Sequence, residues 1–168
     1  LLHYKLKNSI INMKKKINHK KAPNFKIPST DGKIFELNKI KNKYIVIYFY
    51  PKDDTPGCTI ETNDFNSLLQ KFKKLDCLVI GVSKDSIDSH NKFRKKYNIK
   101  FNLLADDKKE AIKAYKTWGK KKFMGREFMG IIRTTYLIDK KGKIIKIWEN
   151  VKVKDHAKEV LETLKSIS

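Results

Sequence analysis

The chain has 168 residues, with 39 lysines and arginines against 18 aspartates and glutamates, which gives a formal net charge of +21. This length suits one domain with a core of its own. No apolar stretch approaches the roughly 18 residues of a membrane-spanning helix, and two cysteines are too few for a secreted disulfide framework. We therefore expect a soluble protein from a reducing intracellular compartment.

Residues 1–22 are basic and contain no acidic side chain. They predict a flexible N-terminal arm ahead of a domain over residues 23–168. Their composition also suits a nuclear address or the remnant of an organellar transit peptide. We expect the nucleus or the cytosol as the compartment, with an organelle such as a plastid as the alternative.

Two short strands, 25–27 and 34–37, flank a turn and predict an N-terminal β-hairpin. Residues 44–50 follow as an unbroken β-branched and aromatic run, which is typical of a strand covered on both faces of a sheet. Pro51 ends this strand, and a polar turn comes next.

A helix is predicted over residues 57–74, because its apolar side chains recur along one stripe. Cys58 lies in the first turn of that helix, where unpaired N–H groups and the helix dipole favour a reactive thiolate. The proline and glycine directly before Cys58 indicate an exposed loop. The alternative is a cysteine packed in the core as a small apolar residue.

The rest of the chain alternates strands and helices and then ends in a second hairpin and a helix. The expected elements are strand 77–83, helix 86–97, strand 103–105, helix 108–115, strand 134–139, strand 143–148 and helix 154–167. Asp85 or Ser86 can cap the helix that follows it. A βαβα unit implies parallel strands joined by a right-handed crossover.

The segment 118–130 is predicted to be a loop, and it contains Phe-Met-Gly twice, at 123–125 and 128–130. The glycines suggest backbone turns. The aromatic and sulfur side chains could line the rim of an active site or a partner surface, or they could form a small satellite core beneath the loop.

Two separated motifs resemble the peroxiredoxins, and among them the bacterioferritin comigratory protein or Q-type subgroup. Pro51, Thr55 and Cys58 match the pattern P-x-x-x-T-x-x-C inside the block DDTPGCTIE, and GIIRTTYLID at 130–139 resembles the strand with the family's active-site arginine. The resemblance implies a thioredoxin-like α/β fold, with a central mixed β-sheet flanked by helices. It also implies a thiol-dependent peroxidase that reduces hydrogen peroxide or organic hydroperoxides.

For such a peroxidase, Cys58 is the expected nucleophile, which becomes a sulfenic acid. Arg133 is the expected cation that stabilises the thiolate and the departing oxygen, although it could be a solvated surface residue. Thr55 offers a hydroxyl to the peroxide or only a local bond within the turn. Pro51 would shield the site from water, or would only end the strand.

Glu61 lies three residues after Cys58, on nearly the same helix face. The resemblance implies that it supports the polar network of the active site. The alternative is a carboxylate that the dipole favours at a helix start. A negative charge here opposes ionisation of Cys58 unless a cation such as Arg133 lies between them.

Many members of the subgroup carry a resolving cysteine five residues after the first, where this chain has Asn63. The only other thiol is Cys77. A helix of about sixteen residues would hold Cys58 and Cys77 roughly 24 Å apart, whereas a disulfide needs Cα atoms within about 7 Å. We therefore expect a one-cysteine cycle in which thioredoxin, glutaredoxin or glutathione reduces the sulfenic acid.

Other functions have less support. A thiol-disulfide oxidoreductase normally needs Cys-x-x-Cys, and the position three after Cys58 holds Glu61. A chromatin- or nucleic-acid-associated redox protein would rest on charge alone, which favours non-specific binding to polyanions at low salt. The four histidines are too scattered to suggest a metal site, so we expect no metal and no cofactor. A surface with so much positive charge would repel a second copy of the chain, so we expect a monomer.

Overall fold

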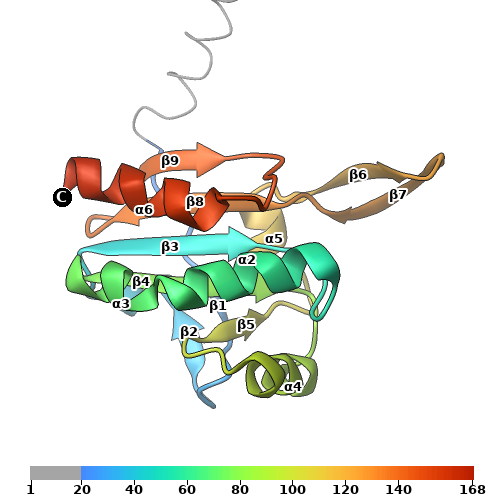
Figure 1. Cartoon of the computed structure of the whole chain (residues 1–168), viewed down its shortest axis with the longest axis horizontal. Helices are drawn as coiled ribbons and strands as arrows, with labels where there is room; N and C mark the ends of the chain where they lie inside the picture. Colours follow the sequence, from blue (N-terminus) through green and yellow to red (C-terminus); the bar gives the residue numbers. More distant parts are fainter. Residues whose placement is uncertain (1–19) are drawn as a thin grey trace, which may run out of the picture.

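The computed structural model describes residues 20–168; residues 1–19 of the predicted arm lie outside the described residues. A five-stranded mixed sheet forms the centre of the molecule (Figure 1). In spatial order its strands are β5 (Leu103–Ala105), β4 (Cys77–Ser83), β3 (Tyr44–Phe49), β8 (Thr134–Asp139) and β9 (Ile144–Trp148). Strands β3, β4 and β5 run parallel, and β8 and β9 are antiparallel to their neighbours.

Every residue of β3 is buried, because the sheet is covered on both faces. Successive side chains point to opposite faces, so Val46 and Tyr48 join one core cluster while Ile45 and Ile47 join the other. The central mixed sheet flanked by helices is therefore confirmed, and so is the buried strand that leads to Cys58.

The first core cluster lies beneath four helices on one face of the sheet (Figure 1). They are α2 (Pro56–Ser67), α3 (Leu69–Lys74), α4 (Ile87–Tyr97) and α6 (His156–Ile167). The second cluster lies beneath shorter elements on the other face. They are β1 (Lys26–Pro28), β2 (Ile34–Glu36), the 3-10 helix Leu37–Lys39 and α5 (Glu110–Ala114). The expected N-terminal hairpin is thus present as β1 and β2, which pair in antiparallel register.

The helix expected over 57–74 is two helices, so that prediction was wrong in its continuity. Leu68 separates α2 from α3, with φ −98° and ψ 2°, outside the helical region. Just before the break, the Ser67 hydroxyl donates to the Asp64 carbonyl at 3.0 Å, and a local side-chain bond of this kind competes with the helical ladder. The apolar stripe continues across the break, because Phe65, Leu69 and Phe72 are all buried.

The segment 118–130 is a β-hairpin that projects from the body of the molecule, and not a loop (Figure 1). Among residues 20–168, strands β6 (Trp118–Phe123) and β7 (Arg126–Ile131) pair only with each other. Met124 and Gly125 both have positive φ, as a two-residue hairpin turn of type I′ requires. The satellite-core interpretation is wrong, because Met124 is 90% exposed and Phe123 is also exposed.

The first described residues are tied to the sheet. Lys21 bridges to Lys143, the Ala22 amide donates to the Gly142 carbonyl at 2.7 Å, and Ala22 is buried. Residues 20–22 were predicted to belong to the flexible arm, yet here they pack beside the turn between β8 and β9.

Candidate active site

Cys58 lies in the first turn of α2, just past the carboxyl end of β3. Thr55 has the extended backbone of an N-cap residue, and Pro56 occupies the first helical position, where a missing N–H group does no harm. Cys58 is only 1% exposed and belongs to the first core cluster. The expected exposed loop position is therefore wrong, because the thiol packs in the core.

Arg133 is the group that covers Cys58. It belongs to the two-residue link between β7 and β8, and its Nη2 lies 3.4 Å from the Cys58 Sγ. Gly57 permits this approach, since a Cβ there would meet Nη2 at 3.1 Å. The guanidinium is not a solvated surface group, because its side chain is 16% exposed. The two motifs, 75 residues apart in sequence, thus meet at one site.

The other side of the guanidinium contacts Glu61. Arg133 Nη1 donates to Glu61 Oε1 at 2.8 Å, while Nη2 faces the thiol, so the cation lies between the two acidic groups. This is the arrangement that lets a carboxylate neighbour a thiolate without strong repulsion. Burial alone would lower the pKa of Arg133, but the facing charges of Glu61 and Cys58 raise it. Arg133 therefore remains charged.

Glu61 is fully buried and does not lie at a solvated helix start. Its side chain is 0% exposed, and its Oε2 has no hydrogen-bond partner among residues 20–168. Burial raises the pKa of Glu61 to about 7, and the charge and hydrogen bond of Arg133 act in the opposite direction. The group can therefore gain or lose a proton near neutral pH.

We expect the free energy of unfolding to fall as pH rises from about 4.5 to about 7, because the folded carboxyl of Glu61 binds its proton more tightly than the unfolded one. The Glu61→Gln substitution should remove a fall on the order of 3 kcal/mol. Burial lowers the pKa of His156 to about 4. His156 therefore makes the free energy of unfolding rise with pH over much of this range, opposite to the effect of Glu61. The comparison with wild type therefore isolates Glu61.

Denaturant unfolding at pH 4.5, 6 and 7.5 measures this effect. Glu162→Gln, which removes an exposed carboxylate on α6, is the matched control and should follow the wild-type pH dependence. Parallel curves for wild type and Glu61→Gln would contradict the assignment.

Thr55 and Pro51 lie in the loop that joins β3 to α2. The Thr55 hydroxyl donates to the Lys52 carbonyl at 2.8 Å, so the local turn bond predicted as an alternative is present. The hydroxyl oxygen keeps lone pairs with which it can accept a further hydrogen bond. Pro51 is half-buried and lines a cavity of about 400 Å³ together with Lys121, Phe128 and Met129 of the β6–β7 hairpin.

Lys121 is a neighbour of the site that the sequence did not single out. Its Nζ donates to the Ile131 carbonyl at 2.8 Å. Its pKa is lowered by burial and by the charge of Arg133, and the Cys58 thiolate acts in the opposite direction. Because the chain contains so many lysines, the sequence gives no signal for Lys121. Only the pairing of β6 with β7 places Lys121 beside the site.

Cys77 lies far from this constellation. It pairs with Tyr44 at the start of β3, whereas Cys58 follows the other end of that strand. Both cysteines are free thiols. Burial raises the pKa of Cys77 to about 12, so this thiol stays protonated and unreactive at neutral pH.

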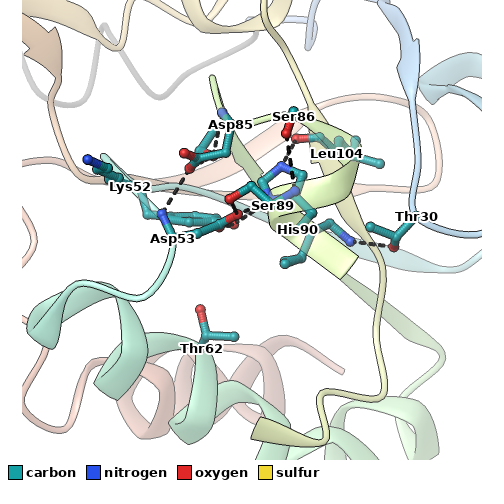
Figure 2. Close-up of polar contacts among 12 residues, drawn as sticks. Thr30, Lys52, Asp53, Thr62, Asp85, Ser86, Ser89, His90 and Leu104 are labelled. Carbon is teal, nitrogen blue, oxygen red and sulfur yellow. Dashed lines mark hydrogen bonds and ion pairs between the residues drawn. The ribbon is translucent and has the colours of Figure 1, made fainter. Parts of the chain in front are cut away.

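A second polar cluster, which the sequence does not indicate, lies beneath the loop that leads to Cys58. Asp53, Asp85 and His90 bring potential metal-ligand atoms within 4.8 Å of one another (Figure 2). The histidines were judged too scattered, yet His90 meets two carboxylates where parallel strands β3 and β4 both end. No local pattern in the sequence marks this cluster, because Asp53 and His90 are 37 residues apart.

No helix within residues 20–168 combines the length and the apolar composition needed to cross a bilayer. Residues 19–147 match the AhpC/TSA family. The chain is 50% identical over 148 residues to the peroxiredoxin Bcp of Bacillus subtilis, which covers 88% of this chain and 94% of that protein. It is 35% identical over 144 residues to the peroxiredoxin Bcp of Escherichia coli, with coverage of 86% and 92%.

Solved structures give the same result. A structure of the Xanthomonas campestris bacterioferritin comigratory protein, described for its alkyl peroxide reduction activity, aligns with a TM-score of 0.81 at 37% identity over 85% of this chain and 91% of that one. A structure of peroxiredoxin Q from the same organism aligns with a TM-score of 0.80 at 38% identity, with coverage of 84% and 90%.

Proposed function

This chain belongs to the AhpC/TSA family and is a thiol-dependent peroxidase, a peroxiredoxin, and from that premise we propose a chemical role for each residue of its site. The Cys58 thiolate attacks one oxygen of the peroxide. The O–O bond breaks, Cys58 becomes a sulfenic acid, and the other oxygen leaves and takes up a proton as water or an alcohol. The alternative as a Cys-x-x-Cys oxidoreductase is not favoured.

The observation that carries this assignment is the 3.4 Å contact between Arg133 Nη2 and Cys58 Sγ. A fixed cation favours the thiolate before attack and stabilises the negative charge that moves to the departing oxygen. Glu61 holds the same guanidinium through Nη1 and so fixes its direction. Glu61 is thus assigned as a positioning residue for Arg133.

Thr55 and Pro51 are assigned to the peroxide side of the site. Thr55 is half-buried at the start of α2, and its hydroxyl oxygen can accept a hydrogen bond from a hydroperoxide while its hydroxyl group continues to donate to the Lys52 carbonyl oxygen. Pro51 lines the adjacent cavity and has no N–H group that would attract water.

The catalytic cycle uses one cysteine of this chain and an external thiol. An external thiol attacks the sulfenic acid, releases water and forms a mixed disulfide, and a second thiol then restores Cys58 and leaves as part of an external disulfide. Thioredoxin, glutaredoxin and glutathione are the candidate reductants. Support comes from the buried, protonated Cys77 at the far end of the sheet and from Asn63 in place of a nearby cysteine.

Turnover of Cys77→Ser tests this cycle. With hydrogen peroxide and each of the three reductants in turn, the variant should match wild type, because Cys77 takes no part in either half-reaction. A variant that consumes one equivalent of peroxide and then stalls, while wild type continues, would show that Cys77 resolves the sulfenic acid.

Two further proposals concern binding to polyanions and the compartment in which the enzyme works. The charge of +21 supports non-specific binding to polyanions, including nucleic acid, at low salt. Free thiols support a reducing compartment. The bacterial relatives give no support to a nucleus or a plastid. A domain over residues 23–168 and a monomeric state remain proposals from sequence. So does an arm over residues 1–22, although residues 20–22 pack against the sheet.

A further inference from the structure

A buried hydrogen-bond network joins the active-site loop to α4 and has no part in the chemistry described above. Asp53 Oδ2 lies 2.7 Å from His90 Nδ1 and accepts from the Ser89 hydroxyl at 2.8 Å. Asp53 Oδ1 accepts from the Tyr50 hydroxyl at 2.6 Å. The side chain of His90 is 0% exposed and that of Asp53 is 4% exposed.

The contacts of His90 fix the number of protons in this network. Its Nε2 lies 2.9 Å from the Leu104 carbonyl oxygen, which can only accept, so Nε2 carries a proton. Its Nδ1 lies 2.7 Å from Asp53 Oδ2 and 3.3 Å from the Tyr50 hydroxyl, and the Tyr50 proton is already donated to Asp53 Oδ1, so the bond between the ring and the carboxyl group needs a proton of its own. The His90 ring and the Asp53 carboxyl group are therefore joined by one short hydrogen bond between two buried side chains.

The same contacts disfavour a metal ion. A metal would need lone pairs that are free on His90 and on the carboxylates of Asp53 and Asp85. Both ring nitrogens and both Asp53 oxygens are engaged in hydrogen bonds, and Asp85 Oδ2 accepts from the Ser83 hydroxyl at 2.6 Å. Hydrogen bonds within the protein therefore account for the contacts of His90 and Asp53 without an ion.

The network holds the loop at Asp53, and an exposed contact follows at Asp54. The Asp53 amide donates to Asp85 Oδ2 at 2.9 Å, so its backbone is fixed as well as its side chain (Figure 2). Asp54, which has a φ of 57°, contacts Lys96 Nζ at 2.8 Å and the Tyr97 hydroxyl at 2.6 Å. Thr55 and the first turn of α2 follow directly, so the position of Cys58 depends on this short loop.

We propose that the buried Asp53–His90 ion pair is a positioning device that fixes the loop 51–55, and through it Thr55 and Cys58, in the geometry that reaction with peroxide requires. The proposal rests on the proposed role of Cys58. A loosened loop would move the nucleophile relative to Arg133, and small displacements of reacting groups lower rates strongly. The exposed contact of Asp54 with Lys96 is screened by water and contributes little by comparison.

The ¹⁵N spectrum of the His90 ring tests the ion pair without reference to activity. At pH 7 in the reduced protein, both ring nitrogens should carry a proton and show the shifts of an imidazolium. In Asp53→Asn, Nδ1 should lose its proton while Nε2 keeps the one it donates to Leu104. A wild-type ring with only one protonated nitrogen would overturn the assignment.

The rate of Cys58 oxidation tests the positioning role. Asp53→Asn and His90→Gln should each lower it about 10- to 100-fold in protein that circular dichroism shows to be folded. The double variant should be no slower than the slower single one, because the residues act as a unit. Lys96→Ala, the matched control at the same loop and helix, should stay within about twofold of wild type.

Two results would overturn the positioning role: single variants within twofold of wild type, or losses that multiply in the double variant. A wild-type protein without rapid Cys58 oxidation would instead contradict the proposed function, while the ¹⁵N result would still stand. The two failures can therefore be told apart.

Discussion

The Cys58→Ser variant should show no peroxidase turnover, because a serine hydroxyl is not ionised at neutral pH and cannot replace a thiolate as the nucleophile. Serine is close in size to cysteine, so the buried site should keep its shape. Steady-state peroxide consumption with an excess of a thiol reductant measures the loss. Cys77→Ser is the matched control, since it removes the other thiol of the chain and should retain activity.

Residual turnover in Cys58→Ser above that of the buffer would mean that another group reacts with peroxide. A melting temperature far below that of wild type would make the comparison invalid, so thermal unfolding of both serine variants accompanies the assay.

The Arg133→Ala variant should react with hydrogen peroxide about 10²- to 10³-fold more slowly than wild type, which is the loss expected when one preorganised donor to a developing anion is removed. The substitution removes the cation 3.4 Å from Cys58 Sγ and leaves the buried Glu61 without its partner. Stopped-flow measurement of the oxidation of the reduced protein gives the rate constant directly.

Two further variants separate charge from fold. Arg126→Ala removes an exposed arginine of β7 and should leave the rate unchanged. Combining Arg133→Ala with Glu61→Gln removes the uncompensated buried carboxylate, so its stability should recover while the rate stays low. An Arg133→Ala rate within a few fold of wild type would show that the guanidinium does not act on the thiol.

The sequence predicted the elements whose signal is local. The apolar run of β3, the cysteine at the next helix start and the Ser86 cap of α4 are each visible in a few consecutive residues, and the structure contains all three. A second motif, which resembles one in the family, indicated Arg133. The structure contains the contact between Arg133 and Cys58.

The sequence could not predict features that depend on how distant segments pack. Cys58 is buried because Arg133, 75 residues away, covers it. His90 meets Asp53 across 37 residues, and neither has a neighbour in sequence that marks the pair. The sequence predicts a loop at 118–130 because its lysines and glycines lack the alternation of a half-buried strand, whereas the structure has a largely exposed β-hairpin there.

Trapping of the oxidised cysteine tests the central claim most directly. Reduced protein receives one equivalent of hydrogen peroxide in the presence of a nucleophile that captures sulfenic acids, and mass spectrometry of the peptides locates the adduct. We expect a single adduct on Cys58, with Cys77 recovered as a free thiol. An adduct on Cys77, or a stoichiometric disulfide between the two cysteines, would contradict the account.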